Sequence, residues 1–294
     1  MIEEKPEDKC ETVLFSLEGQ DRQGEGGLRK QGYFKTSQPD KPLITVVTVV
    51  YNGEKFLENT IQSVINQTYD NVEYIIIDGG SIDGTFDIIR KNQHAVDYWV
   101  SEKDRGIYDA MNKGIDLATG DWINFMNGGD RLFKHETLHA VFSSLEDKDA
   151  DIFYGNHEVC YPSGRKRQAK AGLVKNLWKG SQFCHQATFV NSRYHKAHKF
   201  NLCTKIVADF EFFYLAWKNN AKFKHVPEII CSFEAGGVSD VKRIDSIVGW
   251  WHVVEKGLGV DLFYIMKIVF ELAKKIIKFV KIKLAKVLFN VFCM

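Results

Sequence analysis

One uninterrupted apolar stretch, LITVVTVV at residues 43–50, limits the folds open to this chain. Its branched side chains favour extended backbone, and the lack of alternation with polar residues indicates a strand buried on both faces. Strands of that kind occur in parallel sheets that carry helices on both sides. The sequence Tyr51-Asn52-Gly53 interrupts the run and so marks the carboxyl end of the strand.

The pattern of an apolar strand followed by an amphipathic helix repeats up to about residue 133. Short loops between such elements predict βαβ units, whose right-handed crossovers place the strand carboxyl ends along one edge. We therefore expect an α/β fold with a Rossmann-like, mainly parallel sheet flanked by helices, and a ligand site at that edge. The expected strands are 43–50, 72–77, 96–100 and 122–126, and the expected helices are 54–67, 85–91 and 107–118.

Four acidic residues stand in the loops at this edge. Carboxylates that converge repel one another unless a cation or hydrogen-bond donors compensate them. Their oxygens suit Mg²⁺ or Mn²⁺, which also bind diphosphate groups. Each loop alone is typical of an ordinary turn, but four on one edge predict a metal-assisted site. These residues are Asp78, Asp83, Asp104 and Asp130, with glycines at 79, 80, 128 and 129 that permit close approach of a ligand.

The overall composition excludes several classes of protein. With 39 basic and 38 acidic residues, the net charge of +1 gives no indication of nucleic-acid binding. The six cysteines contain no C-x-x-C pair, which argues against a zinc site and favours a reducing compartment. The acidic start lacks the apolar core of a signal peptide, and no apolar run reaches the roughly 18 residues that span a membrane. We therefore expect a cytoplasmic protein.

Three motifs follow one another along this part of the chain: ITVVTVVYNGEKFLENTIQSVINQ, YIIIDGGSIDGT and SEKDRGIYDAMNKGIDLATGDWINFMNGGD. In this order and spacing they resemble the inverting glycosyltransferases of family 2, which have the GT-A fold. The resemblance runs from about Pro42 to Phe133 and is closest to bacterial enzymes that build capsular, exopolysaccharide or O-antigen repeat units. It implies a nucleotide-sugar donor, with a UDP-sugar favoured, and a lipid-linked saccharide acceptor.

The resemblance also implies roles for residues in these motifs. Asp130 falls in the metal-binding acidic motif, although Asn127-Gly128-Gly129-Asp130 keeps one acid where two or three are common. Metal binding would then depend on the donor diphosphate as well. The second motif reads DGGS where many members have DDGS, which leaves the base contact to Asp78 alone. The implied donor-binding residues are Val50, Tyr51, Asn52, Asp78, Asp104, Arg105, Gly106, Asp109 and Gly129.

A predicted helix at 209–219 begins with two acids, Asp209 and Glu211. Acids are common in a first helical turn because of the helix dipole, but the family places its catalytic base at such a helix start. Asp209 matches that base, which would take the acceptor proton in one inverting displacement. The implied acceptor-binding residues are His185, Gln186 and Glu211; for His185 an ordinary buried histidine remains the alternative.

The last segment, residues 261–294, has the pattern of an amphipathic helix. Six of its seven lysines fall on an arc of about 140° at 100° per residue, and two acids leave it a net charge of +5. A broad apolar face beside lysines predicts a helix lying in a membrane interface, attracted by anionic lipids of the inner membrane. The alternative is a surface helix packed on the domain.

These patterns divide the chain into three parts. Residues 1–40 form an N-terminal extension that is flexible or packed on the surface, with Tyr33 and Phe34 as its expected anchors. The GT-A domain spans 41–255, with a nucleotide-sugar half at 41–133 and an acceptor half at 134–255. Residues 256–294 form the membrane-associating helix, which holds the protein on the cytoplasmic face of the membrane.

Other functions with a similar fold leave different patterns. A dinucleotide-dependent oxidoreductase would have G-x-G-x-x-G at the first helix, and a nucleotidyltransferase would have a basic, glycine-rich loop where this chain has YNGEK. A non-catalytic membrane-bound nucleotide-sugar-binding protein stays open, because the motif at residues 127–130 is poor in acids.

Overall fold

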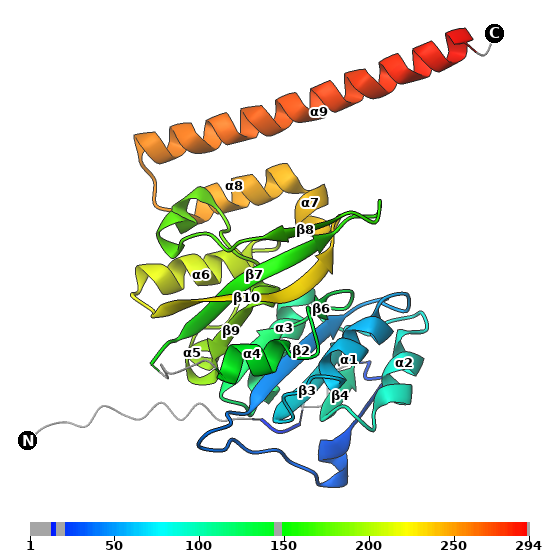
Figure 1. The fold of residues 1–294 in the computed structure, drawn as a ribbon, viewed down its shortest axis with the longest axis vertical. Coiled ribbons are helices and arrows are strands. Elements are labelled where there is room, and N and C mark those ends of the chain that lie inside the picture. Colours follow the sequence, from blue (N-terminus) through cyan, green and yellow to red (C-terminus); the bar gives the residue numbers. More distant parts are fainter. Residues whose placement is uncertain (1–12, 16–20, 144–148, 293–294) are drawn as a thin grey trace, which may run out of the picture.

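A computed structural model describes residues 13–15, 21–143 and 149–292 of the chain. Its ten described strands form one twisted sheet with helices on both faces (Figure 1). The strand order is β1-β4-β3-β2-β5-β9-β7-β10-β6, and β8 pairs with β7. The strands are β1 Gly24–Gly26, β2 Ile44–Val50, β3 Val72–Asp78, β4 Tyr98–Ser101, β5 Trp122–Phe125, β6 Arg131–Leu132, β7 Ile152–Cys160, β8 Lys166–Ala169, β9 Thr188–Asn191 and β10 Phe223–Glu234.

Strand β2 is the centre of the half at residues 41–133 and is parallel to both of its neighbours, β3 and β5. Strand β4 continues the parallel arrangement beyond β3, as expected. The other half differs from the expected mainly parallel sheet. There β9 is antiparallel to β5 and β7, β6 is antiparallel to β10, and only β7 and β10 run parallel. The order β4-β3-β2-β5 places a topological switch between β2 and β5.

Helices cover the sheet in two layers. One core cluster packs Val47 and Val49 of β2 against α3, α6 and α8, and the other packs Val46 and Val50 against α1 and α4. This division follows from the strand geometry, because successive side chains point to opposite faces. The helices are α1 Leu57–Ile65, α2 Thr85–Asn92, α3 Ile107–Leu117, α4 Thr137–Ser143, α5 Ser192–Ala197, α6 Ala208–Lys218, α7 Val238–Val241, α8 Arg243–Val253 and α9 Leu258–Phe292; the 3₁₀ turns are η1 Leu28–Gln31, η2 Val174–Lys179 and η3 His185–Ala187.

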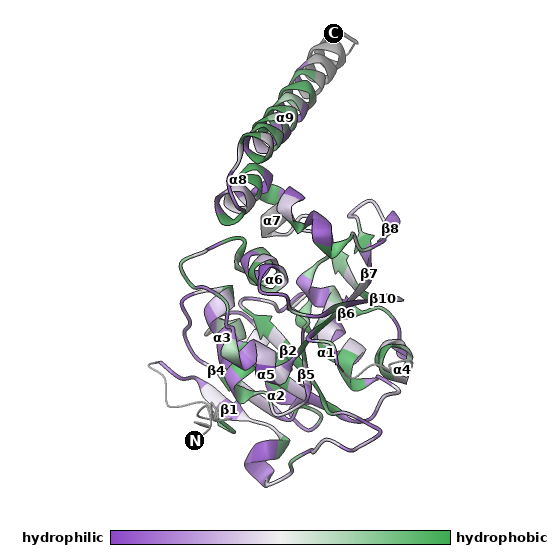
Figure 2. Cartoon of the chain, turned by 90° about the vertical axis from the view of Figure 1, so that its left-hand side faces the viewer, coloured by the Kyte–Doolittle hydropathy of each residue, from purple (hydrophilic) through white to green (hydrophobic). Residues whose placement is uncertain are grey.

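Helix α9 packs against the domain through its first turns only and then extends away from it (Figures 1 and 2). Tyr264 is fully buried and donates a hydrogen bond to the carbonyl of Trp178 in η2, at 2.9 Å. Lys267 bonds the carbonyl of Lys179, at 2.7 Å. Among the described residues, none of the helices is both long enough and apolar enough to cross a membrane.

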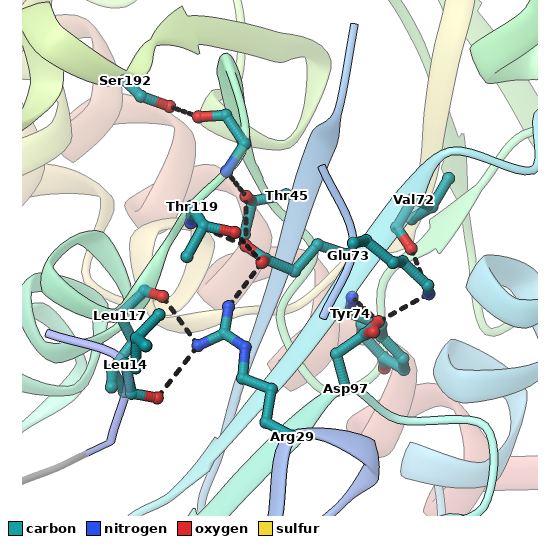
Figure 3. A network of polar contacts seen from close by, with 12 residues as sticks. Leu14, Arg29, Thr45, Val72, Glu73, Tyr74, Asp97, Leu117, Thr119 and Ser192 are labelled. Atoms are coloured by element: carbon teal, nitrogen blue, oxygen red, sulfur yellow. Dashed lines mark hydrogen bonds and ion pairs between the residues drawn. The ribbon is translucent and has the colours of Figure 1, made fainter. Parts of the chain in front are cut away.

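The N-terminal extension joins the sheet rather than lying apart from it. Strand β1 pairs antiparallel with β4, and the following turn inserts Arg29, which is only 3 % exposed. Its guanidinium makes an ion pair with Glu73 of β3 (Nη2–Oε1, 2.5 Å; Figure 3). Tyr33 and Phe34 are 65 % and 50 % exposed, so the prediction that they anchor this segment is wrong. The anchor is polar because the buried carboxylate of Glu73 needs a compensating charge.

Glu73 has further partners from two other segments. Thr45 donates its hydroxyl to Oε2 at 2.6 Å, and the backbone N–H of Thr119 donates to the same oxygen at 2.8 Å. Arg29 in turn donates from Nη1 to the carbonyls of Leu14 and Leu117, at 3.2 and 2.9 Å. The network therefore links the extension, two strands of the sheet and the end of α3 (Figure 3).

We predict that Arg29→Met lowers the free energy of unfolding by about 3–5 kcal/mol, because it leaves the Glu73 charge buried without a cation. Arg29→Met combined with Glu73→Gln should be more stable than Arg29→Met alone, since glutamine keeps an oxygen acceptor without the charge. Urea unfolding measures all three proteins. Lys30→Met, which removes a partly exposed ion pair with Glu25, is the control and should cost less than about 1 kcal/mol. An Arg29→Met effect as small as this control would contradict the role given to the buried pair.

Candidate active site

The turn after β2 and the loop after β3 brace each other at the carboxyl edge of the sheet. The N–H of Asn52 donates to the hydroxyl of Ser81 at 2.7 Å, and the N–H of Ile82 donates back to Asn52 Oδ1 at 3.0 Å. The carbonyl of Val50, the last residue of β2, accepts from the N–H of Gly79 at 2.9 Å. Tyr51 between them is exposed, so its ring is available at the predicted base-binding position.

Asp78 ends β3 and is fully buried. Its Oδ1 accepts from the hydroxyl of Ser81 and its Oδ2 from that of Ser101, both at 2.5 Å. The carboxylate therefore holds the loop in shape, and its predicted contact with a nucleotide stays a prediction. Ser101 was missed from the sequence, although it ends β4 in register with Asp78 and so could have been found from the strand ends.

The loop before α3 carries the other predicted donor-binding residues. Gly106 has a positive φ of 118° and donates its N–H to Asp104 Oδ1 at 2.7 Å. Arg105 is exposed and pairs with Asp109 at 2.8 Å. A Cβ at Gly79 would lie 2.5 Å from Asp104 Oδ2. The glycine that replaces the usual second acid therefore leaves room for the carboxylate of Asp104, and burial raises the pKa of that carboxyl group.

The four carboxylates expected at the edge do not converge on one cation. Asp83 accepts from the N–H groups of Thr85 and Glu54, at 3.0 and 3.1 Å. Asp104 accepts from its own loop, and Asp78 accepts from its own loop and from β4. In the described part of the chain no three His, Cys, Asp or Glu side chains gather into a metal site. Protein hydrogen-bond donors contact each of the four carboxylates, so the described residues do not gather them into one shared metal site.

Asp209, at the start of α6, lies in a chain of hydrogen bonds between residues far apart in the sequence. Tyr108 in the first turn of α3 donates to its Oδ1 at 3.0 Å. Its Oδ2 lies 3.1 Å from Nδ1 of His185, and Nε2 of His185 lies 2.9 Å from the amide nitrogen of Asn127. This chain of hydrogen bonds thus joins α6, α3, η3 and the loop after β5.

The donors in this chain determine where the protons lie. The amide nitrogen of Asn127 can only donate, so in the neutral ring Nε2 of His185 accepts and Nδ1 carries the proton shared with Asp209. Burial acts to raise the pKa of Asp209, but the hydrogen bond and charge of His185 outweigh it and lower that pKa. Burial acts to lower the pKa of His185, and Asp209 reverses this shift as well. Asp209 is therefore held ionised, as a proton acceptor must be.

Asp130 and Gln186 form a second contact beside this chain. Gln186 Nε2 donates to Asp130 Oδ2 at 2.8 Å, so the predicted acceptor residue is bonded to the predicted metal ligand. Gly129 has a φ of 107°, and its N–H bonds the hydroxyl of Thr60 at 2.9 Å, which fixes the turn. Burial raises the pKa of Asp130 to about 6. A cation near this carboxylate would relieve the cost of its charge, so the residue fits a metal ligand.

Glu211 is not part of the same group. Its Oε1 accepts from the amide of Asn201 at 3.2 Å. Residues two apart on a helix point in different directions, so Glu211 cannot share the position of Asp209. Its acceptor-binding role stays a prediction.

Two members of the chain, Tyr108 and Asn127, were not assigned from the sequence. Tyr108 is next to the predicted donor residue Asp109, but nothing local shows that it reaches α6. Asn127 was noted only as a missing acid, whereas the structure gives its amide a partner in His185.

Comparisons with known proteins identify the family of the chain. The family model "Glycosyl transferase family 2" matches residues 45–213. A PGL/p-HBAD biosynthesis glycosyltransferase of Mycobacterium bovis BCG is 30 % identical over 210 residues, which cover 68 % of this chain and 80 % of that protein.

Two solved structures share the fold at low sequence identity. Staphylococcus aureus TarS 1-349 in complex with UDP gives a TM-score of 0.55 at 15 % identity, covering 76 % of this chain and 69 % of that one. The mannosyltransferase PcManGT of Pyrobaculum calidifontis, in complex with GDP-Man and Mn²⁺, gives 0.56 at 17 % identity, covering 82 % and 74 %.

We predict that the pKa of His185 lies above the ordinary value of 6.5 in the native protein and falls when Asp209 is replaced by Asn. Asparagine removes the charge that outweighs burial, so the neutral ring becomes favoured. NMR titration of the His185 ring, assigned with a His185→Gln variant, measures the change. His195, whose pKa burial lowers to about 4, is the internal control and should not move. An unchanged His185 pKa in Asp209→Asn would show that the two groups are not coupled.

Proposed function

This chain belongs to glycosyltransferase family 2, and from that premise we propose that it is an inverting enzyme. It would move a sugar from a nucleoside-diphosphate sugar to a hydroxyl of a lipid-linked saccharide, in the synthesis of a bacterial surface polysaccharide. The observation that carries this proposal is the half-buried Asp209–His185 pair, which lies beside the donor-side helix α3.

The pair supports one displacement step. Asp209 accepts the proton of the attacking hydroxyl, which makes the oxygen a better nucleophile. Tyr108 and His185 hold both carboxylate oxygens, so the base keeps one orientation while the acceptor enters. Attack opposite the departing diphosphate inverts the anomeric carbon and requires no covalent enzyme intermediate.

A divalent cation, Mg²⁺ or Mn²⁺, is part of the proposal. When bound, it would stabilise the charge of the leaving diphosphate. Asp130 would hold it together with diphosphate oxygens, a mode that Mg²⁺ uses when few carboxylates are present. Gln186 keeps the Asp130 carboxylate in place. The Mn²⁺ complex of the mannosyltransferase neighbour supports this choice of cofactor.

For the donor we propose a UDP-sugar. Exposed Tyr51 offers a stacking surface for the base, and the turn at Asn52 is rigid because Ser81 bonds it. UDP in the TarS complex and GDP-Man in the PcManGT complex support a nucleotide-sugar donor. GDP-sugars are the alternative donors, and the assay below distinguishes them from UDP-sugars.

The packing of α9 supports attachment to a membrane. The side of the helix that contacts the domain carries Val260, Phe263, Tyr264, Lys267 and Ile268. The opposite side, here called the outer face, is 46–65 % exposed and spans about 180° at 100° per residue. The residues of the outer face are Leu262, Ile265, Met266, Val269, Phe270, Leu272, Ile276, Ile277, Phe279 and Val280.

An apolar face of this size, turned away from its own domain, needs a partner. We propose that it lies in the cytoplasmic leaflet of the inner membrane. Lysines such as Lys274 and Lys275 flank it and would contact anionic lipid headgroups. The protein would then be peripheral, cytoplasmic and close to a lipid-linked acceptor.

Asp209→Asn should lower sugar transfer by about 100- to 10 000-fold, because it removes the general base without changing side-chain shape. Glu211→Gln, the same kind of change on the same helix, is the matched control and should retain most activity. The assay follows nucleoside diphosphate release from UDP-, GDP- and dTDP-sugars with a lipid-linked acceptor extract. Asp130→Ala and a chelator should each abolish the release.

Equal activities of Asp209→Asn and Glu211→Gln would overturn the assignment of the base. If no donor releases nucleoside diphosphate but a nucleotide raises the melting temperature, the chain is a non-catalytic nucleotide-sugar-binding protein rather than a transferase.

Met266→Gln combined with Ile276→Gln should abolish binding to vesicles of phosphatidylglycerol and phosphatidylcholine. Lys274→Gln with Lys275→Gln should weaken binding roughly 30-fold, from about 1 kcal/mol per lysine. Lys91→Gln with Lys222→Gln removes two lysines elsewhere and is the control. Cosedimentation measures binding. The outer face would have another partner if the Met266/Ile276 variant bound vesicles as the wild type does. The same conclusion would follow if the wild type formed a dimer without lipid and the variant did not.

A further inference from the structure

Two cysteines and a histidine form a cluster directly behind His185. The sulfur of Cys184 lies 3.7 Å from that of Cys231. Cys184 is half-buried and precedes His185 in the chain, whereas Cys231 is fully buried in β10. His157 on β7 is in register with Cys231, and its Nδ1 is buried with no hydrogen-bond partner. The mechanism proposed above uses none of these three side chains.

The two thiols have different reactivities. Burial acts to raise the pKa of Cys184, but hydrogen bonds from Cys231 and His157, with the charge of both nearby histidines, lower it well below the usual value. Burial and the neighbouring Cys184 raise the pKa of Cys231. A thiolate is the reactive form of cysteine, so Cys184 is the nucleophile of the pair and Cys231 the second thiol.

We propose that Cys184 and Cys231 form an oxidation site at which a peroxide creates a disulfide and thereby displaces His185. In the first step the Cys184 sulfur attacks hydrogen peroxide, breaks the O–O bond and becomes a sulfenic acid, with release of water. In the second step the sulfur of Cys231 attacks that sulfenic sulfur and releases a second water. Two thiols and one peroxide thus give one disulfide and two waters.

The fold determines which cysteine moves. A disulfide requires the sulfurs to approach from 3.7 Å to about 2.05 Å. Cys231 is held in β10, which pairs with β7 on one side and with β6 on the other. Cys184 lies in a loop that leads into the short turn η3. Cys184 therefore moves toward Cys231 and pulls His185 with it.

Displacement of His185 has a direct chemical consequence. The 3.1 Å contact with Asp209 and the 2.9 Å contact with Asn127 both depend on the position of the ring. Their loss leaves Asp209 with Tyr108 as its remaining side-chain partner in this group. The disulfide would therefore inactivate the site reversibly, and reduction by a thiol would restore it.

The test uses the full chain treated with hydrogen peroxide and then with dithiothreitol. Peptide mapping without reduction should find Cys184 linked to Cys231. Other pairings are available, because the chain has six cysteines, including Cys10 and Cys293 outside the described residues. Sugar transfer should fall at least tenfold in the oxidised protein and return on reduction. Cys203→Ser, which removes an exposed cysteine, is the matched control and should behave as wild type.

Cys231→Ser separates this mechanism from general damage. It cannot form the bond, so it should accumulate a sulfenic acid at Cys184 that dimedone captures. No Cys184–Cys231 link, or preferential pairing of Cys184 with another cysteine, would overturn the site. A disulfide that leaves transfer unchanged would overturn its effect on His185. The inactivation rests on the proposed function; if no donor is turned over, the pKa of His185 by NMR, before and after oxidation, tests the displacement independently.

Discussion

The parallel pairing of β2 with β3 and β5 is the constraint on which the rest of this structure depends. Strand β2 is buried along its whole length, so both faces must be covered by helices and both edges by strands. Right-handed crossovers then bring the loops after β2, β3, β4 and β5 to one edge. This arrangement of strands alone makes the polar residues in these loops neighbours.

The carboxylates at the carboxyl edge of the sheet differ in where their hydrogen-bond donors come from. Each carboxylate in a partly dry site must find donors or a charge, either in its own loop or in a neighbouring element. Asp78 takes hydroxyls from Ser81 and Ser101, and Asp104 takes the N–H of Gly106. Asp209 finds its donors in Tyr108 and His185, from other elements, so folding of both halves of the domain is needed to build the base.

This distinction explains which parts could be predicted from the sequence. The strands and helices between residues 43 and 133, and the position of the site at their edge, follow from periodicity and from turn residues, which are local signals. The resemblance to the family led to Asp209 and His185. Arg29 and Tyr108 act through contacts with Glu73 and Asp209, which lie far away in the sequence, and no local pattern marks them. Tyr33 and Phe34 show the opposite error, because an aromatic side chain does not by itself identify a buried position.

Helix α9 follows from a local signal, but its orientation does not. The amphipathic pattern predicts the helix and does not say which side faces the domain. A surface helix normally buries its apolar side against its own core. Here Tyr264 and Lys267 make the contact with α8 and η2, because Trp250 and Trp251 of α8 offer ring faces and the carbonyls of η2 offer hydrogen-bond acceptors. This contact uses the mixed side of the helix and turns the apolar side outward. The orientation, rather than the apolar composition alone, is the physical reason to give the helix an external partner.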